Sequence, residues 1–191
     1  MHKAGFVTIL GNPNVGKSTL MNQLMGERLS IITQKAQTTR HRILGVVSEE
    51  DYQIVFSDTP GVINPHHNLH EAMMNFVHNS LEDADVILYM VDSSKEDLKD
   101  IAFLEKIHSL ETPIILLINK IDLIEQDEVS NLIDYWSKKI PKAILLPVSA
   151  LKKFNIDRIR EEILNLLPKS PAYFPKDTLT DKSERFIVSE I

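Results

Sequence analysis

A glycine-rich segment near the N-terminus leaves few folds open to this chain. It reads Gly11-Asn12-Pro13-Asn14-Val15-Gly16-Lys17-Ser18 and matches the pattern G-x-x-x-x-G-K-[ST]. It follows a short apolar run, Phe6–Leu10, and precedes a helical pattern over Thr19–Met25. A strand, a tight loop and a helix in this order are the context in which such a loop encloses phosphate. The segment therefore predicts a P-loop on an α/β sheet.

The residue types in this loop suit a bound nucleotide. Gly11 and Gly16 let the backbone curl so that successive N–H groups point inward, and the helix N-terminus adds partial positive charge. Lys17 would supply a full charge to the β- and γ-phosphates, and the Ser18 hydroxyl would ligate Mg²⁺. The predicted nucleotide-binding residues of this loop are Gly11, Asn12, Pro13, Asn14, Val15, Gly16, Lys17, Ser18 and Thr19.

Strand-length apolar runs alternate with helical patterns along the rest of the chain. The runs cover 6–10, 42–48, 52–57, 86–91, 114–118 and 143–148. The second and third flank the turn Glu49-Glu50-Asp51, which is typical of a hairpin. Apolar residues at helical spacing recur over 129–136 and 156–167, and Trp136 completes the first stripe as a core residue. This alternation predicts an α/β, three-layer fold. Its six-stranded sheet is mostly parallel, with one antiparallel edge strand.

Composition excludes several classes of protein. The 191 residues include no cysteine, which rules out a disulfide framework, a thiol nucleophile and a zinc finger. The longest apolar run has six residues, too few for a membrane anchor, and the N-terminus lacks a secretory signal. We therefore expect a soluble intracellular protein. The formal net charge of −6 makes the chain as a whole a poor partner for nucleic acid.

Two further segments help to decide which nucleotide the P-loop binds. Asp58-Thr59-Pro60-Gly61 follows a strand, where Asp58 would hold the Mg²⁺ shell and the Gly61 N–H would reach the γ-phosphate. Asn119-Lys120-Ile121-Asp122 also follows a strand. There the Asp122 carboxylate would accept the N1–H and 2-amino hydrogens of guanine. Adenine offers neither donor, so the pattern favours GTP over ATP.

The remaining residues of the predicted base pocket have supporting roles. Asn119 would tie its segment to the P-loop, and the stem of Lys120 would cover the base face. Ser149-Ala150 follows a weaker strand, and the Ala150 N–H would donate to guanine O6. An ATP-dependent kinase or ATPase with the same P-loop is the competing class. The segment from Asn119 to Asp122 argues against it.

Taken together, these motifs resemble the GTPases of the Ras-like P-loop superfamily. Within it, the P-loop, the segment Ile32–Arg42 and Asp58–Gly61 resemble the Era family of the TrmE-Era-EngA-like branch. This resemblance implies a GTP-hydrolysing molecular switch in small ribosomal subunit assembly, with small-subunit ribosomal RNA and the 30S subunit as partners of the intact protein. It further implies a monomer in the cytoplasm, with peripheral contact to the inner membrane as an alternative. A non-catalytic GTP-gated module, or a switch in tRNA modification or large-subunit assembly, remains open.

The resemblance also implies catalytic roles for particular residues. The expected catalytic set is Lys17, Asn14, Thr39 and Gly61, and the expected Mg²⁺ ligands are Ser18, Thr39 and Asp58. Thr38 is the alternative to Thr39. Val62 stands where Ras-like members carry a water-orienting glutamine, so hydrolysis would be slow or use another group. The resemblance also implies a K⁺ ion near the α- and γ-phosphates, held by Asn14 and by backbone carbonyls near Thr33 and Lys35. Alternatively, Asn14 only tolerates an unusual backbone angle.

The composition shifts after Pro168. We expect a GTP-binding domain over residues 1–168, a proline-rich linker over 169–182 and the start of a second domain over 183–191. A tail that lies along the surface, ending in a short docked helix, is the alternative. The segment Glu184–Ile191 resembles the beginning of the RNA-binding KH domain of the Era family. RNA binding is then implied for the intact protein through that domain, and is not expected of the present residues.

Overall fold

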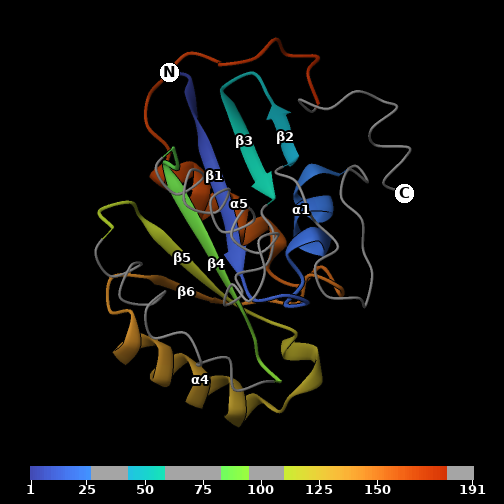
Figure 1. The fold of residues 1–191 in the computed structure, drawn as a ribbon, viewed down its shortest axis with the longest axis vertical. Helices are drawn as coiled ribbons and strands as arrows, with labels where there is room; N and C mark the ends of the chain where they lie inside the picture. Colours follow the sequence, from blue (N-terminus) through green and yellow to red (C-terminus); the bar gives the residue numbers. More distant parts are fainter. Residues whose placement is uncertain (27–42, 59–82, 95–109, 180–191) are drawn as a thin grey trace, which may run out of the picture.

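Six strands form one sheet in the order β2-β3-β1-β4-β5-β6 (Figure 1). The computed structural model describes residues 1–26, 43–58, 83–94 and 110–179. The strands are β1 (Lys3–Gly11), β2 (Ile43–Ser48), β3 (Tyr52–Asp58), β4 (Val86–Asp92), β5 (Ile114–Asn119) and β6 (Ile144–Pro147). Neighbours are parallel except β2 and β3. The expected mostly parallel sheet with an antiparallel edge strand is confirmed.

The helices cover both faces of this sheet. They are α1 (Lys17–Met25), α4 (Gln126–Lys139) and α5 (Ile156–Leu166), with a short 3₁₀ helix, η1, over Ile121–Leu123. Figure 1 shows α1 and α5 on one side of the sheet and α4 on the other. The sequence predicted these three helices, and α1 begins two residues earlier than expected. Among the residues described, no helix is both long and apolar enough to cross a membrane.

Alternate residues of the central strands enter two separate hydrophobic cores. Leu88 and Met90 of β4 join the core under α1 and α5. Tyr89 and Val91 of the same strand join the core under α4, where Trp136 is 3% exposed. Successive side chains of a strand point to opposite faces, so a run that is apolar throughout requires cover on both sides. The three-layer arrangement therefore follows from the continuous apolar runs.

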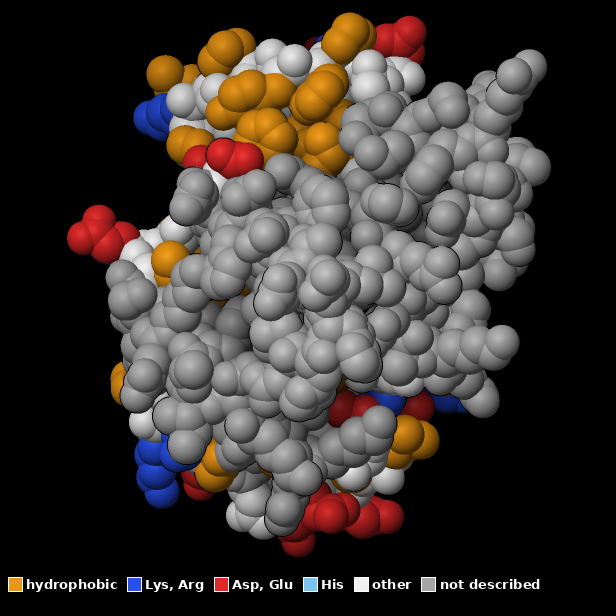
Figure 2. Space-filling view, in the orientation of Figure 1, with side chains coloured by type: hydrophobic (Ala, Val, Ile, Leu, Met, Phe, Trp, Pro, Cys, Tyr) orange, Lys and Arg blue, Asp and Glu red, His pale blue; other side chains and the backbone are white. Residues whose placement is uncertain are grey.

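The segment after α5 lies against the sheet as far as it is described. The Ser170 N–H donates to the His2 carbonyl at 3.3 Å, and the Tyr173 ring lies 5.1 Å from that of Phe6. The Val46 N–H of β2 donates to the Leu179 carbonyl at 2.8 Å. Figure 2 shows hydrophobic side chains gathered on the end of the molecule over which this segment runs. Residues 169–179 thus lie along the surface of the domain, which agrees with the surface tail that was the alternative to a linker.

Candidate functional site

The predicted motifs meet at the carboxyl edge of the sheet. The strand register pairs Ile9 with Asp58, Gly11 with Met90 and Asp92 with Asn119. The loops that follow β1, β3, β4 and β5 therefore leave the same edge. Ligands of open α/β sheets bind outside the carboxyl ends of the strands. This edge is the candidate site.

The P-loop, residues 11–18, depends on its two glycines. A Cβ on Gly11 would lie 2.2 Å from the Met90 carbonyl oxygen of β4, and one on Gly16 would lie 2.4 Å from Nδ2 of Asn119. Both glycines also have positive φ, +148° and +109°. Only glycine fits such close approaches at these backbone angles. Asn14 adopts φ 63°, a left-handed backbone angle that residues other than glycine rarely take, and this fits its alternative role as a loop residue.

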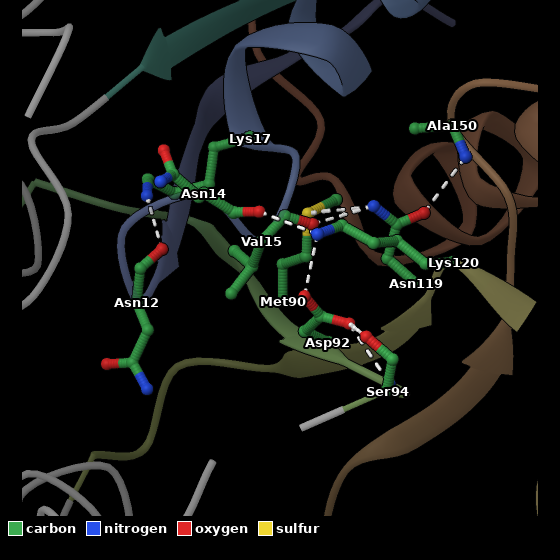
Figure 3. Close-up of polar contacts among 10 residues, drawn as sticks. All are labelled: Asn12, Asn14, Val15, Lys17, Met90, Asp92, Ser94, Asn119, Lys120 and Ala150. Carbon is green, nitrogen blue, oxygen red and sulfur yellow. Dashed lines mark hydrogen bonds and ion pairs between the residues drawn. The ribbon is translucent and has the colours of Figure 1, made fainter. Parts of the chain in front are cut away.

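Lys17 begins α1 and carries the charge of the loop. The residue is 7% exposed, and its Nζ donates to the carbonyls of Gly11 at 3.1 Å and Asn12 at 2.9 Å. The ammonium thus lies over the loop backbone, as Figure 3 shows for the carbonyl of Asn12. Neutral carbonyls are weaker partners for an ammonium than an anion is. A phosphate entering the loop would therefore attract this side chain.

Asn119 joins three loops of the site. The residue is 2% exposed, and its Nδ2 donates to the Val15 carbonyl at 2.7 Å. Its Oδ1 accepts the Ala150 N–H at 2.9 Å (Figure 3). The tie between this segment and the P-loop is as the sequence predicted. The Ala150 N–H, which the sequence assigned to guanine O6, here donates to this amide oxygen, and its contact with the base stays a prediction.

Asp122 is held from the neighbouring loop. It lies in η1 and is exposed, and its Oδ1 accepts the hydroxyl hydrogen of Ser149 at 2.5 Å. Ser149 itself is 1% exposed and follows β6. A hydrogen bond from a buried hydroxyl fixes the direction of the carboxylate. The two motifs that the sequence assigned to the base are thus brought together.

Lys120 crosses from the loop after β5 to the P-loop. Its Nζ donates to the Asn14 carbonyl at 2.8 Å and contacts Oδ2 of Asp92 at 2.6 Å (Figure 3). Sequence reasoning missed Asp92. The signal available was an acidic residue directly after the buried run 86–91, at the same edge as the other motifs. Burial alone would raise the pKa of Asp92, but hydrogen bonds from Lys120 and Ser94 lower that pKa below its ordinary value.

Several predicted site residues lie outside the described residues. They are Thr33, Lys35, Thr38, Thr39, Thr59, Pro60, Gly61 and Val62. Asp58 is described by its backbone alone, as the last residue of β3 beside the end of β1. The roles assigned to all of these residues stay predictions.

The residue types of the candidate Mg²⁺ ligands suit this ion. Ser18 lies in the first turn of α1, and Asp58 ends the strand adjacent to β1. Serine and aspartate supply oxygen donors of the kind Mg²⁺ takes, and phosphate oxygens and water complete such a shell. Within the described ranges, no group of three or more His, Cys, Asp or Glu residues is placed to hold a metal without such help.

Comparison with known proteins links the chain to GTPases. A family model described as 50S ribosome-binding GTPase matches residues 6–120. GTPase Era of Alkaliphilus metalliredigens is 44% identical over 191 residues, which are 100% of this chain and 65% of that protein. GTPase Era of Clostridium beijerinckii is 43% identical, with 100% of this chain and 64% of that protein covered. The chain thus spans about two-thirds, 64–65%, of the length of these relatives.

Solved structures of Era have the same fold. Era in complex with MgGDPNP and nucleotides 1506–1542 of 16S ribosomal RNA matches with a TM-score of 0.93 and 42% identity, over 100% of this chain and 65% of that one. A variant of Aquifex aeolicus Era bound to GDP and AlF4⁻ matches with a TM-score of 0.92 and 42% identity, over 98% and 65% of the two chains. Both of those proteins hold a guanine nucleotide.

Proposed function

Because the chain belongs to the family of 50S ribosome-binding GTPases, we propose that the carboxyl edge of its sheet binds GTP and GDP and hydrolyses GTP. The observation that carries this proposal is the position of Asn119. Its side chain bonds both the P-loop, at Val15, and the loop after β6, at Ala150. A phosphate-binding loop and a base-reading segment are thereby held as one unit. This is what selection of one nucleoside triphosphate requires.

The phosphates would be bound by the P-loop. Backbone N–H groups of residues 14–19 and the Lys17 ammonium face the β- and γ-phosphates in this proposal, as in other P-loops. Ser18 and Asp58 would hold Mg²⁺, with Thr39, or alternatively Thr38, as a further ligand. Mg²⁺, when bound, neutralises charge on the phosphates. Thr59, Pro60 and Gly61 would line the γ-phosphate, and the Gly61 N–H would contact it.

The base would be read by Asp122. Its carboxylate accepts two hydrogens from guanine, and Ser149 fixes its direction by the 2.5 Å hydrogen bond. A site built to pair its polar groups with those of a bound ligand rejects an analogue without the matching donors by roughly 10⁴–10⁵. Competition of GTP against ATP for the purified protein tests the assignment. Equal displacement by the two nucleotides would overturn it.

Hydrolysis transfers the γ-phosphoryl group to water. The water oxygen bonds the γ-phosphorus, the bond to the β–γ bridging oxygen breaks, and GDP leaves with that oxygen. Val62 has no group that orients water, which supports a slow intrinsic rate. Asn14, with carbonyls near Thr33 and Lys35, would hold K⁺, which supplies positive charge beside the phosphates. Turnover in K⁺ against Na⁺ at equal ionic strength tests this role, and equal rates would reject it.

A role in assembly of the small ribosomal subunit is the finer part of the proposal. Its support is the Era relative solved with part of 16S ribosomal RNA, at 42% identity over the whole of this chain. The family description names the 50S subunit, so large-subunit assembly is the alternative, together with tRNA modification. With a ribosomal partner, we propose that the protein acts in the cytoplasm as a monomer. The intact protein should co-sediment with 30S rather than 50S subunits in the presence of a non-hydrolysable GTP analogue.

The RNA contacts would depend on the part of such relatives that lies beyond the match. The acidic balance of this chain, −6, supports that division of roles. The second candidate function is a GTP-gated binding module without turnover, which Val62 favours. Tight GTP binding with no phosphate release, even with K⁺ and the ribosomal subunit present, would support this second candidate over the first.

A further inference from the structure

Asp92 ends β4 among the loops of the nucleotide site, yet none of the recognised motifs contains it. Its side chain is 0% exposed. Oδ2 lies 2.6 Å from Nζ of Lys120, and Oδ1 accepts both the N–H of Ser94 at 3.0 Å and its hydroxyl hydrogen at 2.7 Å. Figure 3 shows these contacts between the P-loop and β5. Each carboxylate oxygen therefore has a fixed direction.

The Lys120 side chain is constrained at both ends. Its backbone has φ 66°, a left-handed conformation uncommon for a residue other than glycine. Its Nζ is shared between Asp92 and the Asn14 carbonyl, which is 2.8 Å away. The side chain thus runs across the gap between two loops, and it is 29% exposed. Without the Asp92 carboxylate, Nζ of Lys120 would keep only the Asn14 carbonyl of these two partners.

Stabilisation of the fold is a weak explanation for this ion pair. The cost of removing a buried charge from water offsets much of the attraction, so a buried pair contributes little net stability. Its effect is mainly geometric. A short charge-assisted hydrogen bond selects one conformation of a long, flexible side chain.

We infer that Asp92 is a positioning residue for the nucleotide base: it holds Lys120 so that the aliphatic stem covers one face of the base. This inference rests on the proposed binding of guanine nucleotides. Asp92 does not touch the nucleotide and acts through Lys120. The stem contributes apolar contact, and the ammonium stays paired beside the P-loop.

This role has a consequence that separates Asp92 from Asp122. Covering a face does not depend on the groups at the edge of the base, because every purine has the same flat face. Asp122 instead reads the edge, including the 2-amino group that GDP has and IDP lacks. Loss of Asp92 should therefore weaken the binding of GDP and of IDP by the same factor. Loss of Asp122 should instead remove the preference for GDP over IDP.

The first experiment compares Asp92→Asn with Asp85→Asn. Asp85 precedes the same strand at its opposite end, where Oδ2 accepts the Phe6 N–H at 2.8 Å, so the control makes the same chemical change away from the site. We expect Asp92→Asn to raise the Kd of both GDP and IDP by about ten- to a hundredfold, mainly through faster dissociation. The ratio of the two Kd values should stay that of the wild type. Asp85→Asn should bind as the wild type does.

The second experiment tests whether Asp92 acts through Lys120. In a Lys120→Met background, adding Asp92→Asn should leave the Kd of GDP unchanged, because the side chain that Asp92 positions is already gone. The double variant carries no unpaired member of the ion pair, so it remains informative if Asp92→Asn alone folds poorly. A melting temperature measured without nucleotide separates unfolding from lost binding.

Each outcome has a definite reading. Wild-type GDP affinity in Asp92→Asn, a changed GDP-to-IDP ratio, or equal effects of Asp92→Asn in both backgrounds would each overturn the inference. Failure of the wild type itself to bind GDP would instead overturn the proposed function. The two failures are therefore distinguishable.

Discussion

The side-chain amide of Asn119 donates to the main-chain carbonyl of Val15 across 2.7 Å, although 104 positions separate the two residues. The same side chain accepts the Ala150 N–H. Nδ2 also lies so close to Gly16 that a Cβ there would be 2.4 Å away. One buried amide therefore sets the distance between the P-loop and the segments proposed to read the base.

Asn119→Ala should destabilise the protein and weaken GDP binding together. It leaves the Val15 carbonyl and the Ala150 N–H without their partner in a buried setting, at a cost of about 2–4 kcal/mol. Urea unfolding and GDP titration measure the two effects. Asn131→Ala is the matched control, because Asn131 is exposed on α4. A stability loss with unchanged GDP affinity would contradict the proposed link between the loops.

Gly11→Ala and Gly26→Ala should differ sharply in cost. Both glycines have positive φ, +148° and +70°. A Cβ at Gly26 meets nothing within 4 Å, so only the left-handed strain of about 1 kcal/mol applies. A Cβ at Gly11 would lie 2.2 Å from the Met90 carbonyl, which adds about 3 kcal/mol or more. Urea unfolding compares the variants, and equal losses would show that the close approach to β4 is unimportant.

Gln53→Leu should release the segment after α5 from the sheet. Gln53 is 0% exposed, and its Nε2 donates to the Phe174 carbonyl at 2.8 Å. Its Oε1 accepts the N–H groups of Tyr173 at 2.7 Å and Phe174 at 2.9 Å. Losing these bonds should cost about 2–3 kcal/mol locally.

Hydrogen exchange measures that release. The amides of Tyr173 and Phe174 should exchange faster in the variant, while those of β4 keep their protection. Gln126→Leu, at the exposed start of α4, is the control. Unchanged exchange at Tyr173 and Phe174 would mean that the stacking of Tyr173 on Phe6 holds the segment instead.

Asp122→Asn should change the preferred base from guanine to xanthine. Its amide can no longer accept both guanine donors, so GDP affinity should fall by about a hundredfold or more. The new N–H can donate to the 2-oxo group of xanthine, so binding of XDP should rise. Titration with GDP and XDP tests this prediction. Asp127→Asn is the control, because Asp127 is exposed on α4. Retained preference for GDP would show that Asp122 does not read the base edge.

The stability of the protein should depend on Asp92 at acid pH. The pKa of Asp92 is lowered in the folded state from its ordinary value of 3.8, so folding favours the charged form. The contribution is fully present above that value and is lost as the pH falls through the folded pKa. Below about pH 4, the free energy of unfolding should therefore fall less steeply in Asp92→Asn than in the wild type. Parallel acid limbs in urea unfolding would contradict the lowered pKa.

The strands, the main helices and most motif positions could be predicted because their signals are local. Buried parallel strands read as continuous apolar runs, as in β4 and β5, and the helical stripe that ends in Trp136 marks α4. The P-loop pattern fixes its own conformation, since Gly11 and Gly16 permit backbone angles that other residues rarely adopt. A single sequence contains all of this information within short windows.

Hydrogen-bond partners that are distant in the chain could not be predicted in this way. Nothing near Gln53 in the sequence indicates Phe174, and nothing near Ala150 indicates that its N–H donates to Asn119. Asp92 became visible as a partner of Lys120 only when parallel pairing of β4 and β5 placed them at one edge. The sequence alone determines which segments are strands, helices and phosphate loops, because periodicity and glycine act locally. Only the tertiary structure decides which polar groups meet, because that depends on strand order and register.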